Sequence, residues 1–364
     1  MAHFIKTLKK TALAASIASL ATVANATIVT SIKPLGFIAS SIADGVTDTE
    51  VLVPAGASPH DYSLKPSDIQ KLQGAELILW VGEDIDAFLD KTLRPMPFKK
   101  VLSIADFAEI GGLLEGEAHD HKHEHDHKHD HAHKHDHAHK HEYDHKHEYD
   151  HKHEHDHKHD HAHKHEHDHK HDHDHKHDHE HKHDHAHGHD HDHSTNWHVW
   201  YSPEISKIVA TRLATRLTEA YPEKKEKIAQ NLAEFNRTLA EQSEKIKQQL
   251  APVKEKGFYV FHDAYSYFNN AYGLKQTGYF TINPLVAPGA KTLAKIKQEI
   301  KEHKVNCLFA EPQFTPKVIE SLSKGTGVHV GRLDPMGDAV KLGVNSYANF
   351  LQYTADSYFA CLSK

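Results

Sequence analysis

The chain has 364 residues and a formal net charge of -8 at pH 7, with 42 histidines and two cysteines. The acidic excess is concentrated in residues 119–193, which carry 21 acidic residues against 11 lysines. The remainder is almost neutral, which excludes a basic surface for nucleic acid. It is long enough for two domains of ordinary size, about 100–150 residues each.

The first 26 residues have the pattern of a cleavable secretory signal peptide. A basic segment with three lysines precedes a short apolar run, and Ala-Asn-Ala at 24–26 is a small-x-small cleavage site. The apolar run is too short to span a bilayer. The pattern predicts a mature chain that begins near Thr27 and lies in the periplasm.

Short β-rich runs alternate with helical patterns in the rest of the chain. Before the acidic segment, we expect strands at 28–32, 51–53, 77–81 and 101–104, with helices at 36–43 and 67–73. After it, we expect helices at 204–220 and 223–250, strands at 258–261, 277–280, 307–310 and 328–332, and helices at 292–303 and 316–324.

Strands separated by helices indicate parallel sheets. The predicted fold class is therefore α/β, with two lobes that each contain a small, mostly parallel sheet flanked by helices. We expect an N-terminal lobe over 27–221, interrupted by an insertion at 115–195, and a C-terminal lobe over 251–364. The long helix at 222–250 would connect the two lobes.

Residues 119–193 form a low-complexity segment in which nearly every second residue is histidine, 36 in all. With almost no apolar side chains to bury, this histidine tract is expected to be disordered. Neutral imidazoles mixed with carboxylates suit Zn²⁺, Cu²⁺ or Ni²⁺, so composition alone indicates a transition metal rather than zinc. The tract could buffer, sense or hand on metal; a repeat expansion without function is the alternative.

Three histidines outside the tract lie at the ends of predicted elements. His60 is in a Pro/Gly-rich loop after a strand, His198 precedes a helix, and His262 follows the strand 258–261. Open parallel sheets bind ligands at such strand ends. Each residue alone would more often be structural, but together they favour a metal site. Three imidazoles suit tetrahedral Zn²⁺ and leave one position for water or an oxygen ligand.

The two cysteines are Cys307 and Cys361. In an oxidising compartment, an isolated pair is more often a disulfide than a redox or metal site. Two separate buried thiols are the alternative.

The motifs around the three histidines resemble those of ZnuA-type zinc receptors, which belong to the metal-binding solute receptors of ABC importers. The resemblance covers most of the mature chain and rests on segments 56–62, 65–68, 198–203, 262–265, 310–314 and 333–335. It implies two lobes joined by a long helix, with metal held in the cleft by His60, His198 and His262. It also implies a disulfide between Cys307 and Cys361, and a histidine-rich insertion is a feature of the group.

The resemblance implies a cargo and partners as well. Three histidines point to zinc, because manganese receptors have a glutamate at the position of His262. Some zinc receptors have a glutamate before the first histidine, where this chain has Pro59. Asp334 matches a carboxylate ligand of relatives, so Asp334 or water is the candidate fourth ligand. The expected role is a monomeric periplasmic receptor that passes Zn²⁺ to an inner-membrane ABC permease, whose ATPase drives release.

Three other functions compete with this interpretation. A zinc hydrolase could use three histidines and a metal-bound water, but no His-Glu-x-x-His motif contains these histidines and no general base accompanies them. A zinc store would rely on the histidine tract alone. A manganese receptor is disfavoured by His262. We therefore expect a binding protein and no enzymatic activity.

Overall fold

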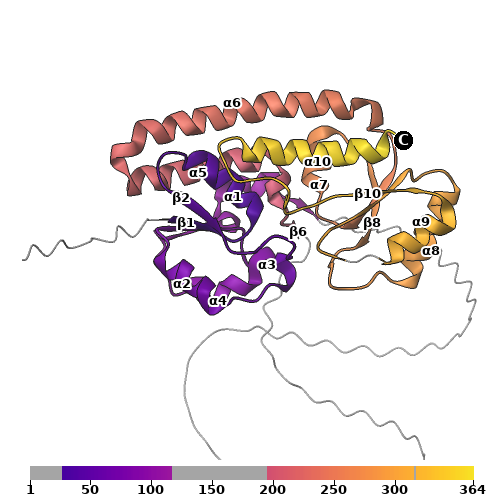
Figure 1. The fold of residues 1–364 in the computed structure, drawn as a ribbon, viewed down its shortest axis with the longest axis horizontal. Coiled ribbons are helices and arrows are strands. Elements are labelled where there is room, and N and C mark those ends of the chain that lie inside the picture. The colour runs from indigo at the N-terminus through magenta and orange to yellow at the C-terminus, as the bar shows by residue number, and fades with distance from the viewer. Residues whose placement is uncertain (1–26, 117–194, 315–316) are drawn as a thin grey trace, which may run out of the picture. The chain divides into compact units, whose positions relative to one another are not determined.

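The computed structural model describes residues 27–116, 195–314 and 317–364 (Figure 1). The expected signal peptide at 1–26 and the histidine tract at 119–193 lie outside the described residues. Within the described ranges, no helix combines the length and the apolar character needed to cross a membrane.

The first lobe is built on a four-stranded sheet in the order β2-β1-β3-β4, and all its pairings are parallel. The central strands are fully or largely buried, as expected for a sheet covered on both faces. Its strands are β1 (Thr27–Thr30), β2 (Asp48–Val51), β3 (Leu77–Trp80) and β4 (Val101–Ser103), and its helices are α1 (Lys33–Ile42), α2 (Pro66–Gly74), α3 (Glu83–Asp86) and α4 (Asp90–Leu93). Each predicted strand is present, although β2 begins three residues earlier than expected.

A short antiparallel pair closes the base of the segment that contains the histidine tract. β5 (Glu115–Gly116) pairs with β6 (Thr195–Asn196). The chain therefore leaves and re-enters the described body at adjacent points. Asn196, at the end of β6, is buried and leads directly to His198.

Two helices follow the insertion. α5 (Pro203–Ala220) begins with proline in its first turn, and the Ser202 hydroxyl accepts a hydrogen bond from the Ile205 N–H at 3.2 Å. α6 (Lys225–Leu250) has 26 residues, which corresponds to about 39 Å at helical rise. Its buried residues recur at helical spacing along one face: Ile228, Asn231, Phe235, Leu239, Ile246 and Leu250. The expected long helix is confirmed.

The second lobe also contains a four-stranded parallel sheet, in the order β10-β9-β7-β8. β7 is buried along its whole length, because it lies inside the sheet. The strands are β7 (Phe258–His262), β8 (Gln276–Thr281), β9 (Cys307–Ala310) and β10 (His329–Arg332), and the helices are α7 (Ser266–Tyr272), α8 (Ala290–Lys301) and α9 (Lys317–Thr326). The predicted α/β class with two parallel sheets is confirmed.

The last helix, α10 (Ser346–Leu362), was not among the elements expected from the sequence. It packs against α6 and against α1 of the first lobe, and it runs beside α6 in Figure 1. The Ser346 hydroxyl donates to the Phe37 carbonyl oxygen at 3.1 Å. The end of the chain therefore returns from the second sheet to the first lobe.

One hydrophobic core cluster includes residues of both lobes. At its centre, the Tyr201 ring stacks on Phe350 with centroids 5.1 Å apart and lies 5.4 Å from the Tyr265 ring. These rings come from the segment after His198, from α10 and from the segment after His262. Because protein cores are packed as densely as crystals, the two lobes are held in a fixed relation.

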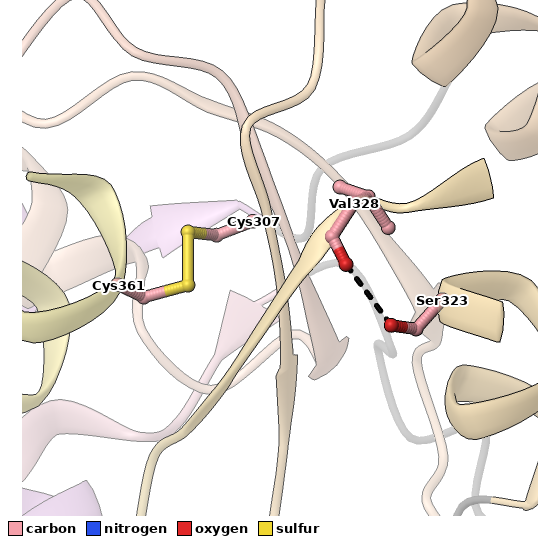
Figure 2. The surroundings of a disulfide bond; sticks show 4 residues. All are labelled: Cys307, Ser323, Val328 and Cys361. Carbon is pink, nitrogen blue, oxygen red and sulfur yellow. Dashed lines mark hydrogen bonds between the residues drawn. A yellow bond between two sulfur atoms is a disulfide. The ribbon is translucent and has the colours of Figure 1, made fainter. Parts of the chain in front are cut away.

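The disulfide expected from the sequence joins Cys307 of β9 to Cys361 of α10 (Figure 2). Both cysteines are buried. On the other side of the sheet's edge strand, the Ser323 hydroxyl of α9 donates to the Val328 carbonyl oxygen at 3.0 Å. The disulfide therefore ties the last helix, α10, to the second sheet.

Removing this disulfide should destabilise the protein without abolishing metal binding. The bond spans 54 residues, and a loop of this size corresponds to about 4 kcal/mol in the chain-entropy model. We expect the Cys307→Ala/Cys361→Ala variant to unfold at lower guanidinium concentration in zinc-free buffer. Equal unfolding midpoints for the two proteins would contradict this expectation.

Candidate metal centre

His60 is placed by a short turn after β2. The turn η1 (Pro59–Asp61) begins with proline, and the Ser58 hydroxyl accepts a hydrogen bond from the His60 N–H at 3.3 Å. Gly56 has a φ of 77°, which glycine adopts without strain, and its N–H donates to an Asp338 carboxylate oxygen at 2.6 Å. The loop that carries His60 is therefore anchored to the segment that follows β10.

His198 is fixed by the amide of Asn196. The Asn196 Oδ1 accepts a hydrogen bond from the His198 backbone N–H at 3.0 Å and lies 2.7 Å from His198 Nδ1. The Asn196 Nδ2 donates to the Asp263 carbonyl oxygen at 3.0 Å, which sets the orientation of the amide. Because Oδ1 is an acceptor, Nδ1 carries the proton and Nε2 presents its lone pair.

His262 ends β7 at the carboxyl edge of the second sheet, and the buried carboxylate of Glu311 holds its ring. His262 Nδ1 lies 2.7 Å and 2.8 Å from the two carboxylate oxygens, and the Tyr265 hydroxyl donates to one of them at 3.0 Å. A carboxylate only accepts, so Nδ1 is again the donor and Nε2 is free to bind metal. Carboxylate–histidine pairs of this kind orient metal ligands in proteins.

The three histidines predicted from the sequence converge on one point. One nitrogen from each lies within 4.8 Å of those of the other two, and no other such group of metal-binding side chains was found among the described residues. The Nε2 atoms of His198 and His262 are 3.3 Å apart. Two nitrogens bound to one tetrahedral zinc ion at about 2.05 Å would be about 3.3 Å apart.

The environment keeps the imidazoles of His60 and His198 uncharged. Burial, with a smaller effect from neighbouring His262, lowers the pKa of His60 to about 3. Burial lowers the pKa of His198 well below its usual value, and the neighbouring histidines add to this effect. Both rings are therefore neutral at neutral pH, which is the protonation state that binds a metal cation.

The histidines line a small cavity of about 10 Å³ together with Trp200, Phe314 and other residues. This volume suits an ion or one water-sized group. The cavity lies between segments of both lobes, because His60 and His198 come from the first lobe and His262 from the second.

Asp334 does not belong to the three-histidine group. Its carboxylate is buried and accepts hydrogen bonds from Gln313 Nε2, Met336 N and Asp338 N. The two other described histidines, His303 and His329, are exposed and lie outside the group.

Glu311, Asn196 and Gln313 also belong to the site or its supports, although their residue types and positions in the sequence did not lead us to expect roles for them. Glu311 follows a predicted strand at the same sheet edge as His262, so its position in the sequence could have indicated that it lies near this histidine. Asn196 lies two residues before His198, but nothing in the sequence indicates that its amide orients the imidazole.

Comparisons with known proteins identify the family of this chain. The family model described as "ZnuA: Zinc-uptake complex component A periplasmic" matches residues 28–361. The chain belongs to the ZnuA family. Relatives named "High-affinity zinc uptake system protein ZnuA" include one from Haemophilus influenzae, 66% identical over 99% of both chains. Another, from Haemophilus ducreyi, is 50% identical over 98% of this chain and 99% of its own.

A solved structure described as the crystal structure of ZnuA has the same fold. It superimposes with a TM-score of 0.63 at 21% sequence identity and covers 93% of this chain and 99% of its own. The two-lobe arrangement is therefore that of the ZnuA family.

Replacing Glu311 with leucine should weaken zinc binding about 10- to 100-fold, because His262 loses the acceptor that fixes its ring. Chelator competition on the purified protein would measure the change. Asp86→Asn is the control, since Asp86 is a buried carboxylate that accepts hydrogen bonds from the Ser31 hydroxyl and the Val81 N–H and is not among the residues that line the histidine cavity. Equal losses in the two variants would indicate a general effect of removing a buried carboxylate.

Proposed function

We propose that this chain captures Zn²⁺ with His60, His198 and His262 and delivers it to an ABC permease for zinc import. The observation that carries the proposal is the convergence of three imidazoles on one point, with a separation of 3.3 Å between the Nε2 atoms of His198 and His262 that suits tetrahedral zinc. The names of the relatives in the ZnuA family support zinc as the cargo.

The proposed setting is the periplasm, which the chain reaches through the signal peptide at 1–26. The family description and the Cys307–Cys361 disulfide support this setting, because disulfides persist in oxidising compartments. The receptor acts as a monomer that docks on an inner-membrane permease, and the associated ATPase drives transfer of the ion. The histidine tract serves as an auxiliary metal-collecting or sensing segment.

The role is binding rather than catalysis. Glu311, the carboxylate that bonds to His262, is engaged at the Nδ1 side of the ring, away from the metal-binding nitrogen. It is therefore poorly placed to act as a general base for a zinc-bound water. Turnover of an activated ester by the zinc-loaded protein would contradict this part of the proposal.

Zinc titration calorimetry on the mature protein lacking residues 119–193 tests the cargo site. The two ends of this deletion can be joined, because the flanking strands β5 and β6 pair with each other. We expect one tight site in this protein and none when His60, His198 and His262 are all changed to alanine. The site should persist in a matched control that carries His303→Asn and His329→Ala, since both residues are exposed and lie outside the group.

Two results would overturn the proposal. Equal zinc binding with and without the three histidines would place the cargo site elsewhere. Loss of all tight binding on removal of 119–193 would make the histidine tract the functional element.

A further inference from the structure

Gln313 lines the same cavity as the three histidines. It lies in the segment that follows β9, two residues after Glu311. No metal-ligating role was expected of it, because a glutamine amide is not among the usual zinc ligands. Its hydrogen bonds, however, give it a defined orientation.

The buried carboxylate of Asp334 fixes the Gln313 amide. Gln313 Nε2 donates to Asp334 Oδ1 at 2.8 Å. A carboxylate cannot donate, so the amide nitrogen must be the atom that faces Asp334, and Oε1 is turned away from it. Asp334 also accepts from the backbone N–H groups of Met336 and Asp338, which hold it in place behind Gln313.

The Gln313 Oε1 atom is buried and has no hydrogen-bond partner among the described residues. A buried carbonyl oxygen without a partner is unfavourable, and in native proteins such atoms are nearly always satisfied. Asp334, in contrast, is not among the residues that line the cavity. The unpaired acceptor at this cavity is therefore the Gln313 amide oxygen.

We propose that Gln313 Oε1 accepts a hydrogen bond from a water molecule that fills the fourth position on Zn²⁺. This inference rests on the proposed function. Three histidines leave one tetrahedral position on the ion open for water. A zinc-bound water is a strong hydrogen-bond donor and therefore needs an acceptor nearby. Asp334 then acts as a positioning residue, since it holds the amide with its oxygen toward the ion.

The test uses the full chain with one substitution at Gln313 and one at a control position. Gln313→Met is close in length but has no amide oxygen to accept a hydrogen bond. Gln298→Met is the matched control, because Gln298 is an exposed glutamine of α8 that bonds only to Glu302 in the described contacts. Zinc affinity is measured by chelator competition. The variant with His60, His198 and His262 all changed to alanine gives the zinc binding that is due to the histidine tract.

We expect Gln313→Met to weaken the tight zinc site about tenfold, a typical loss for an outer-shell partner. Gln298→Met should not change the affinity of that site. A zinc-loaded crystal structure should show an oxygen on the ion within hydrogen-bonding distance of Gln313 Oε1.

The proposal fails if Gln313→Met binds zinc as tightly as its parent. It also fails if the zinc-loaded structure shows an Asp334 oxygen bound directly to the ion. Retention of a tight site in the triple alanine variant is a different result, because it overturns the proposed function and not the role of Gln313 alone.

Discussion

The metal centre depends on a single packing constraint, the shared aromatic core beneath the three histidines. Tyr201 follows His198, Tyr265 follows His262, and both rings contact each other within this core. Phe350 of α10 stacks on Tyr201 and so brings the last helix into the same cluster. Because these rings are fully buried, a shift of one lobe against the other would open a cavity in this core.

This constraint explains how two separate sheets can present ligands to one ion. In each sheet all strands are parallel, so the loops that follow the strands gather at one edge. His60 follows β2 in the first sheet and His262 ends β7 in the second. The returning helix α10 packs on α1 and α6 and is bonded to β9 through Cys361. The distance between the histidines is therefore set by the whole body rather than by any one loop.

The electrostatics of the site favour a cation without requiring a large change on binding. Two imidazoles are kept neutral by burial, and the Glu311 carboxylate supplies one negative charge at the outer nitrogen of His262. The Tyr265 hydroxyl shares that carboxylate. The Nε2 atoms of His198 and His262 are left available for a metal ion, because Asn196 and Glu311 bind the opposite nitrogens of these rings. Such preorganisation reduces the cost of ordering ligands when the metal arrives.

Much of this protein is determined by local sequence. The alternation of apolar strands and amphipathic helices predicts the α/β class, and the long helix is visible from the spacing of Ile228, Phe235, Leu239 and Ile246. His60, His198 and His262 are recognisable as candidate metal ligands because they lie at the ends of predicted elements. The disulfide is expected because the chain has two cysteines and a signal peptide that indicates an oxidising compartment. The helix α10 escaped prediction, since Ser, Thr and Tyr side chains that are buried by tertiary packing blur its apolar pattern.

Only the tertiary structure decided how the three histidines are oriented and which side chains hold them in that orientation. Which nitrogen of an imidazole carries the proton depends on a partner such as Glu311, which is 49 residues from His262 in the chain. The orientation of the Gln313 amide likewise depends on Asp334, 21 residues away. Sequence periodicity reports which face of an element is buried, but it carries no information about contacts between segments that meet only when both sheets and the last helix have packed.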